Sequence, residues 1–322
     1  MAVTNDSTAE VLLTYQQLFQ VAMTEGPISK VSFTLIMSLF FTYLNCTMVY
    51  TLWRKPIFKE SSRYILFTHM LLNDSIHLLV TCLLYVFGLA FFKIVKATCG
   101  FIVFVSAITF SNTPLNLAVM SLERYVAICF PLRHAEIATQ KRTYIAIGVI
   151  WFIASINLII DLLYGVVMDS NFFTSQVMCT RERLFIKQWQ VDVFQVFNIF
   201  YFASVTVIIF FTYISIVITA RSISSNKDSA TKAHKTVLLH LVQLVLCLTS
   251  FLYGFLERAA AMASTSSSLF MDLRYLSFFF VLILSRCLSP LIYGLRDDAV
   301  RPLFMYYFCF AMGKCKSTVN VH

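Results

Sequence analysis

The sequence predicts an all-α membrane protein, a bundle of seven transmembrane helices followed by a short amphipathic helix. Of its 322 residues, 59% are hydrophobic and only 13% are charged, whereas a soluble domain is about half apolar and about a quarter charged. Residues 31–53 and 193–220 are apolar runs without a single charge, and each exceeds the about 20 residues that a membrane-spanning helix needs. Transmembrane β-strands are shorter and alternate in polarity, so a β-barrel is excluded.

The length rule gives seven spans and so divides the chain into three parts. The spans are residues 31–53, 64–92, 97–123, 143–167, 193–219, 236–257 and 275–294. An N-terminal arm (1–30) precedes the transmembrane domain (31–295), and a tail (296–322) follows it. The tail opens with alternating charges and aromatics over residues 296–310, a pattern typical of a helix lying on the membrane surface.

The basic residues indicate the orientation of the chain. With the N-terminus outside, sixteen of the 25 Lys and Arg residues fall on the inner side and eight on the outer side, and Arg286 lies within the last span. Because Lys and Arg accumulate on the cytoplasmic side, we expect a plasma-membrane protein with an extracellular N-terminus and a cytoplasmic C-terminus. The net charge of +9 then reflects topology, and we expect no nucleic-acid partner, since the basic residues do not gather on one soluble face.

Several surface residues carry predicted modifications. Asn5 begins an Asn-Asp-Ser sequon on the outer arm and is a candidate glycosylation site. Cys99 and Cys179 both lie on the outer side, where the compartment permits a disulfide, although their spacing alone leaves the pairing open. Cys309 and Cys315 follow the amphipathic segment, where either palmitoylation or two unmodified thiols fit.

Two ionisable residues lie deep in the predicted spans. Asp74 is about ten residues into the second span and Arg286 about twelve into the seventh, and such residues are functional candidates because hydrocarbon rejects charge. Their similar depth suggests an ion pair, with snorkelling of Arg286 or a wet cavity as the alternative. Soluble-enzyme motifs such as G-x-S-x-G and H-E-x-x-H are absent, so we expect neither an enzyme nor a cofactor.

A string at the inner end of the third span is the most specific motif. It reads MSLERYVAIC over residues 120–129 and continues with PLRH at 131–134. With it come Asn45, Asp74, Trp151, Tyr213, the KAHKT segment at 232–236 with His240, and the SPLIY segment at 289–293. Over about residues 30–305 the chain resembles class A (rhodopsin-like) G-protein-coupled receptors, particularly odorant receptors of the fish type.

The resemblance implies a mechanism and partners. Cys99 and Cys179 would form the disulfide between helix 3 and the second outer loop. Glu123 would hold Arg124 at rest, beside Tyr125, until an outward movement of helix 6 releases Arg124 to the G protein. Tyr213, His240 and Tyr293 would rearrange with this switch. The expected partners are a small-molecule odorant and a stimulatory, olfactory-type heterotrimeric G protein.

The seventh span departs from the family pattern. Ser289 replaces an asparagine that in the family helps to hold a sodium ion beside the helix 2 aspartate. Arg286 lies one turn away on the same helix. We therefore predict that the Arg286 guanidinium takes the place of sodium as the partner of Asp74, within a polar core that also holds Asn45.

The resemblance places the ligand between helices 3, 5, 6 and 7, in the outer half of the bundle. Ser106 lies about 27 Å outward of Arg124 at 1.5 Å per residue, a depth that suits such a pocket. The candidates are mostly aromatic with a few polar groups, which fits a small, partly apolar ligand. They are Ser106, Phe110, Ser111, Asn198, Tyr201, Phe202, Phe251, Phe255, Glu257, Tyr275 and Phe279.

Two alternatives remain at this stage. One is a non-olfactory class A receptor for a peptide, a lipid or an amine, against which the helix 3 string argues. The other is a transporter or channel that uses Asp74 and Arg286 as a relay, although the sequence shows no internal repeat of the kind common in transporters.

Overall fold

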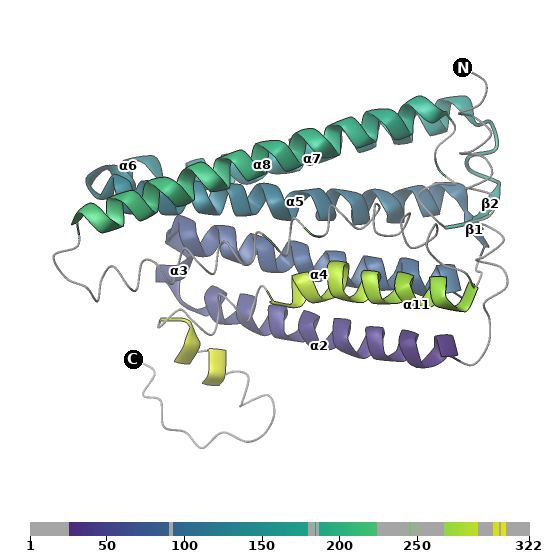
Figure 1. Cartoon of the computed structure of the whole chain (residues 1–322), viewed down its shortest axis with the longest axis horizontal. Helices are drawn as coiled ribbons and strands as arrows, with labels where there is room; N and C mark the ends of the chain where they lie inside the picture. Colours follow the sequence, from purple (N-terminus) through teal and green to yellow (C-terminus); the bar gives the residue numbers. More distant parts are fainter. Residues whose placement is uncertain are drawn as a thin grey trace.

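The computed structural model describes residues 26–89, 93–179, 184, 187–223, 245, 249, 267–288, 299–302 and 304–306. Long helices run side by side through this part of the chain (Figure 1). They are α2 (Gly26–Arg54), α4 (Ser62–Leu89), α5 (Lys96–Cys129), α7 (Gln140–Met168), α8 (Gln188–Ile223) and α11 (Ser267–Ser277), which continues into the π-helical segment η3 (Phe278–Leu284). The shorter elements are α3 (Pro56–Glu60), β1 (Lys93–Val95), η1 (Pro131–Arg133), α6 (His134–Ile137) and β2 (Gln176–Met178).

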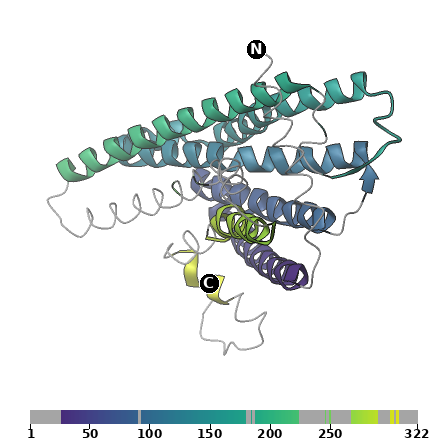
Figure 2. The same ribbon diagram turned by 45° about the vertical axis from the view of Figure 1, so that its right-hand side comes forward.

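Helix α5 is the centre of the described bundle. It packs against α4 on one side and against α7 and α8 on the other, and α4 in turn packs against α2. Both ribbon views show α11 beside the pair formed by α2 and α4 (Figures 1 and 2). The two ends of the bundle differ: one carries β1, β2 and Cys99, and we call it the disulfide end; the other carries Glu123, and we call it the Glu123 end.

Five of the predicted spans are confirmed as helices long and apolar enough to cross a membrane. They are Ser29–Arg54, Ser62–Phe87, Lys96–Cys129, Gln140–Met168 and Asp192–Thr219. The predicted sixth span (236–257) lies outside the described residues except for helical positions 245 and 249. The seventh is described up to residue 288 and is apolar from Tyr275 to Leu288.

Helix boundaries differ from the predicted spans because a helix does not end where hydrocarbon ends. Helix α2 begins at Gly26, inside the predicted N-terminal arm. Helix α5 continues to Cys129, past the predicted limit at residue 123, so Glu123 and Arg124 lie on rigid helix. Phe130 then leaves helical geometry before Pro131, which fits the rule that the residue before a proline avoids the α region.

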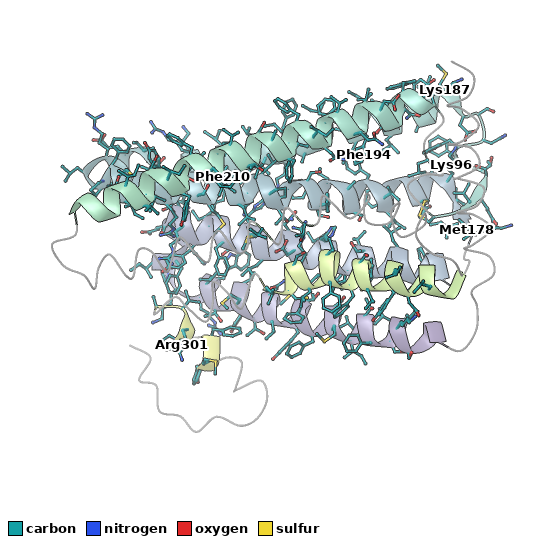
Figure 3. The ribbon with its side chains drawn as sticks, viewed as in Figure 1. Lys96, Met178, Lys187, Phe194, Phe210 and Arg301 are labelled. Atoms are coloured by element: carbon teal, nitrogen blue, oxygen red, sulfur yellow. A yellow bond between two sulfur atoms is a disulfide. The ribbon has the colours of Figure 1, made fainter. Side chains whose placement is uncertain are left out.

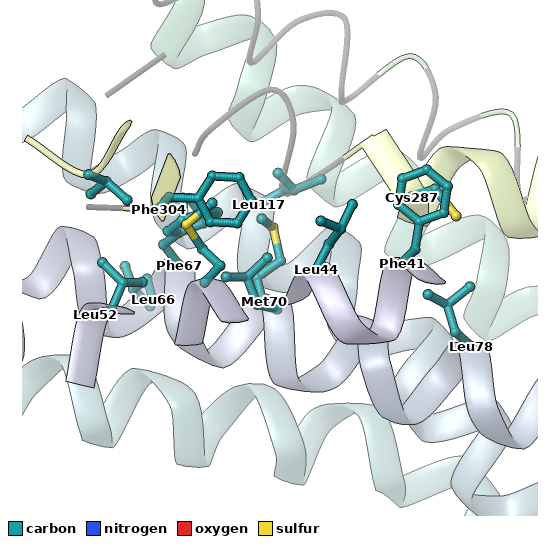
Figure 4. Close-up of a cluster of buried hydrophobic side chains, with 14 of the residues drawn as sticks. Phe41, Leu44, Leu52, Leu66, Phe67, Met70, Leu78, Leu117, Cys287 and Phe304 are labelled. Carbon is teal, nitrogen blue, oxygen red and sulfur yellow. The ribbon is translucent and has the colours of Figure 1, made fainter. Parts of the chain in front are cut away.

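The lipid-facing and interior surfaces of the helices are both apolar. Ile36, Phe152 and Val207 are each more than 60% exposed, and such outward apolar faces suit a bilayer rather than water. Inside, a hydrophobic cluster lies between α2, α4 and α5 and includes Met48 and Met70, both fully buried. Figure 4 shows this cluster, in which Phe67 lies near Leu117 and Phe304, and Leu66 lies beside Leu52.

The tail contributes to the same cluster. Val300 and Phe304 are buried in it, and the Phe304 amide donates to the Val300 carbonyl at 2.8 Å, a helical hydrogen bond. Figure 3 places Arg301 near this end of the chain, and Lys96, Met178 and Lys187 at the disulfide end. The longer amphipathic helix predicted for 296–310 stays a prediction, because most of that segment lies outside the described residues.

Candidate functional site

An ion pair lies in the interior of the bundle, between α4 and the helix that follows η3. Arg286 Nη1 is 3.1 Å from Asp74 Oδ1, and the two side chains are 3% and 0% exposed. Arg286 also donates from Nη2 to the Phe110 carbonyl on α5, at 3.3 Å, and its guanidinium lies 5.8 Å from the centre of the Phe110 ring. The guanidinium therefore joins three helices at one point.

Pro114 explains why the Phe110 carbonyl serves as an acceptor. A helical carbonyl normally receives the N–H of the residue four positions later, and proline has no N–H to give. Pro114 lies inside α5, four residues after Phe110. Arg286 therefore supplies to the Phe110 carbonyl the hydrogen-bond donor that Pro114 lacks.

A chain of polar side chains fixes the carboxylate from the other side. Thr113 Oγ1 donates to Asp74 Oδ1 at 2.9 Å, and Asn73 donates to Thr113 Oγ1 at 2.9 Å. Asn112 donates to Asn73 Oδ1 at 3.4 Å. Such hydrogen bonds offset part of the cost of burying the pair. This chain holds Asp74 in one orientation.

His77 extends the polar core toward the disulfide end. Its Nδ1 lies 3.1 Å from Thr109 Oγ1, and Thr109 in turn donates to the Val105 carbonyl at 2.8 Å. Its Nε2 lies 3.4 Å from Thr81 Oγ1. Both ring nitrogens of this buried histidine are thus engaged by hydroxyl groups.

A second charged group lies at the Glu123 end. Arg124 Nε is 3.2 Å from Glu123 Oε2, and His134 Nε2 is 3.1 Å from Glu123 Oε1. The Tyr125 ring packs against Phe130 and, on α8, against Phe211. Cys129 Sγ lies 3.3 Å from Thr219 Oγ1, so the ends of α5 and α8 are joined beside this pair.

The disulfide end carries a short two-stranded sheet held against α5. Strands β1 and β2 pair antiparallel, with Ile94 opposite Val177, and the structure confirms the Cys99–Cys179 disulfide. Phe172 is buried and lies against Gly100 and Gly165, where an added Cβ would approach its ring to 3.3 Å. The two glycines therefore leave the space into which the loop aromatic packs.

A salt bridge secures the segment that leads into β2 to the start of α5. Lys96 Nζ is 2.6 Å from Asp169 Oδ2, and the Asn171 amide donates to Asp169 Oδ1 at 3.0 Å. The hydrogen bond from Lys96, followed by that from the Asn171 amide, holds the pKa of the Asp169 carboxyl below its usual range.

This arrangement, with a charged pair at the end of the third long helix and a disulfide at its other end, agrees with the comparisons. The sequence matches the family described as 7 transmembrane receptor (rhodopsin family) over residues 28–293. The chain belongs to this family. It is 33% identical to Odorant receptor 131-2 of Danio rerio over 276 residues, which cover 85% of this chain and 84% of that protein.

Two human proteins are further relatives of this receptor. Olfactory receptor 2AJ1 of Homo sapiens is 30% identical over 143 residues, 44% of either chain. Olfactory receptor 52A1 of Homo sapiens is 28% identical over 203 residues, 60% of this chain and 62% of the relative. The protein is accordingly an olfactory-type, multi-pass membrane receptor and not an enzyme.

The Arg286 guanidinium supplies a positive charge beside Asp74, where the family resemblance implies a sodium ion. Oδ1 of Asp74 receives both Arg286 and Thr113. Ser289 lies outside the described residues. Asn45 is fully buried, and its amide has no hydrogen-bond partner among the described residues.

The predicted ligand residues fall into two groups. Ser106, Phe110 and Ser111 lie on α5, and Asn198 and Phe202 lie on α8, the two helices that pack together. Tyr201 is turned elsewhere: its hydroxyl donates to the Ile153 carbonyl on α7 at 2.7 Å. Its ligand role stays a prediction, while the structure gives it a contact that holds α8 to α7.

Tyr275 and Phe279 contact α2 and α4. Thr34 donates to the Tyr275 hydroxyl at 3.5 Å, and the Phe279 ring lies 5.3 Å from that of Phe33. Lys30 pairs with Asp272 beside them, and the Tyr85 ring stacks on Phe278 at 4.6 Å. These aromatics close the seam between α11 and its neighbours, so a ligand contact for either one stays a prediction.

Sequence reasoning did not identify the partners of His69, a hydrogen-bonded histidine between α4, α5 and α7. Trp151 Nε1 donates to His69 Nε2 at 2.9 Å, so His69 Nδ1 carries the ring proton that faces Asn116 Oδ1 at 3.2 Å. Asn116 then donates to the Leu66 carbonyl at 3.1 Å. The sequence signal for this contact was a histidine inside the second span together with Trp151 inside the fourth.

Several predicted site residues lie outside the described part of the chain. They are Asn5, His240, Phe251, Phe255, Glu257, Tyr293, Cys309 and Cys315. Tyr213 is described and lies half-buried on α8.

Proposed function

We propose that this protein is an odorant receptor that binds a small, partly apolar molecule near the disulfide end and activates a stimulatory, olfactory-type G protein at the Glu123 end. The N-terminus would be extracellular and the C-terminus cytoplasmic, as the distribution of basic residues favours. The observation that carries the proposal is the Glu123–Arg124 pair at the end of α5 in a chain related to odorant receptors.

The proposed switch depends on how exposed the side chains of Arg124 and Glu123 are. The Arg124 side chain is 18% exposed and that of Glu123 only 8%, so the arginine lies at the rim of the bundle and the acid behind it. Outward movement of helix 6 would release Arg124 to a partner peptide, with Tyr213, His240 and Tyr293 rearranging beside it. A ligand drives such a change only by binding one conformation more tightly than the other.

The loop beside the pair offers an apolar contact for the same partner. Leu132 is 96% exposed on η1, next to Phe130, which is also exposed. Exposed apolar residues that gather beside a polar group favour a protein interface. We assign Leu132 to the G-protein contact together with Arg124.

The proposed ligand site lies between helices 3, 5, 6 and 7. Ser106 and Phe110 on α5 and Phe202 on α8 support it, since these helices pack together and the residues are only half-buried. Phe110 also contacts Arg286, so a ligand against this ring would touch the ion pair indirectly. Phe251, Phe255 and Glu257 would complete the site from helix 6.

Three modifications belong to the same proposal. Asn5 would carry a glycan on the extracellular arm. Cys309 and Cys315 would carry palmitoyl chains that hold the tail against the membrane.

Production of cyclic AMP in cells tests the proposal. Cells expressing the chain are exposed to a panel of water-soluble odorants, with surface expression measured alongside and Arg124→Ala as the matched inactive variant. A dose-dependent rise that Arg124→Ala abolishes supports the receptor and its coupling. A response that persists in Arg124→Ala at equal surface expression contradicts the assigned switch.

A further inference from the structure

Glu123 is shared between two partners from different segments. Its Oε2 pairs with Arg124, the next residue on α5. Its Oε1 lies 3.1 Å from Nε2 of His134, the first residue of α6. The carboxylate is 8% exposed, whereas the histidine is 35% exposed, so the imidazole covers the acid from the solvent side.

The chemistry of the contact fixes its direction. An ionised carboxylate only accepts hydrogen bonds, so His134 Nε2 carries the proton and donates it to Oε1. A hydrogen bond to a charged acceptor is about twice as strong as a neutral one. The contact therefore occupies Oε1 whether the imidazole is neutral or positively charged.

Independent anchors hold the segment that carries His134. The Ala138 amide donates to the His134 carbonyl at 2.8 Å. Ser62 on α4 donates to the Ala138 carbonyl at 2.5 Å, and Thr143 on α7 donates to the Ser62 hydroxyl at 2.8 Å. Arg142 Nη1 donates to the Glu136 carbonyl at 2.9 Å. The loop is thus fastened to two helices, so the His134 imidazole is held against Glu123 before any partner binds.

The occupied oxygen changes what Glu123 offers to Arg124. Arginine and a carboxylate pair most strongly through two parallel N–H···O bonds, one to each oxygen. Since Oε1 accepts from His134, that two-oxygen arrangement competes with the histidine. Removing the imidazole would leave both oxygens for Arg124.

We propose that His134 is a positioning residue that weakens the resting Glu123–Arg124 pair by holding one oxygen of Glu123. The inference rests on the proposed G-protein coupling and adds a residue that sets how much of the receptor is active without ligand. His134 acts through Glu123 and touches neither ligand nor reacting atoms.

The test compares purified receptors for GTP exchange on a stimulatory G protein in the absence of odorant. His134→Phe keeps a ring but removes the donor, so basal exchange should fall about threefold to tenfold, the net range of one ordinary intramolecular hydrogen bond. His134→Gln restores an N–H donor and should return exchange toward the wild-type level. Glu136→Gln, an acid change in the same short helix, is the matched control and should leave basal exchange unchanged.

A double-mutant cycle separates this inference from the proposed function. Glu123→Gln should raise basal exchange, and adding His134→Phe to Glu123→Gln should change nothing further. The thermal unfolding midpoints of the same four proteins give a readout that needs no G protein, and the two single shifts should not add. Equal basal exchange in His134→Phe and wild type, or additive midpoints, overturns the inference. If Glu123→Gln and Arg124→Ala leave exchange unchanged, the proposed coupling fails, and the regulatory role of His134 fails with it, whatever the midpoints show.

Discussion

Pro114 and Arg286 complement each other across the bundle. The proline deprives the Phe110 carbonyl of its usual helical donor, and Arg286 Nη2 donates to that carbonyl at 3.3 Å. The same guanidinium meets Asp74 through Nη1 at 3.1 Å. Because a planar guanidinium has several N–H donors in fixed directions, one side chain serves both the carboxylate and the freed carbonyl.

Breaking the ion pair from either side should destabilise the receptor. Asp74→Asn leaves a buried guanidinium without its counter-ion, and the loss of one partner of a buried pair costs about 3–5 kcal/mol. Arg286→Lys keeps the charge but has a single nitrogen for two acceptors, so its unfolding midpoint should lie between those of wild type and Arg286→Gln. Thermal unfolding of purified receptor measures the series.

The double variant Asp74→Asn with Arg286→Gln controls for simple loss of packing. It removes both charges, so it should recover part of the stability lost in each single variant, because no unpaired charge stays buried. If the double variant is less stable than wild type by the sum of the two single losses, the two residues do not act as a pair.

Sodium should not modulate this receptor. The positive charge that a sodium ion would bring to Asp74 is already supplied by Arg286, so odorant potency should be the same in sodium chloride as in choline chloride at equal ionic strength. Concentration–response curves for cyclic AMP in the two salts measure it. A potency shift with sodium in the wild type that Asp74→Asn abolishes would falsify the substitution of the guanidinium for the ion.

The Trp151–His69 hydrogen bond should contribute to holding α4 against α7. Trp151→Phe keeps an aromatic ring but removes the donor, and leaving the partly buried His69 acceptor without a partner costs about 1–3 kcal/mol. Thermal unfolding should therefore show a lower midpoint for Trp151→Phe than for Trp53→Phe, a control at a tryptophan that is 65% exposed. Equal midpoints in the two variants would mean that the bond adds nothing to stability.

Hydrophobic run length predicted the five confirmed spans, and intramembrane charge predicted the partners Asp74 and Arg286. Both signals are strong because hydrocarbon penalises exposed polar groups heavily. The Cys99–Cys179 bridge followed from the family resemblance, since spacing could not select it. Motif position likewise indicated Glu123 and Arg124 without showing what else they contact.

Contacts that depend on helix rotation and loop path could not be predicted. Tyr275 was expected to face a ligand, but the seam it closes with Thr34 and Tyr85 depends on how α11 is turned. His134 was visible in the PLRH string, yet its approach to Glu123 depends on the path of η1 and α6. The pairing of Arg286 with the Phe110 carbonyl needed the proximity of two helices 176 residues apart in the chain.

The segment before β2 should loosen in strong acid through Asp169. The pKa of the folded Asp169 carboxyl is depressed by the bond from Lys96, so the pair stabilises this segment at every pH above the unfolded value of about 3.9. The contribution is lost as pH falls through the lower, folded pKa. Hydrogen exchange of the amides in residues 172–178, corrected for intrinsic rates, should be constant from neutral pH to about pH 5 and should accelerate below about pH 4.

Asp169→Asn provides the comparison for this last measurement. It removes the charge that Lys96 pairs with, so the same amides should exchange faster than in wild type at neutral pH and should respond less to acid. The disulfide still holds Cys179 to α5 in this variant, which confines the change to the segment before β2 and the Lys96 contact. Identical exchange in the variant and the wild type across the pH range would show that the disulfide and strand pairing alone set the stability of this segment.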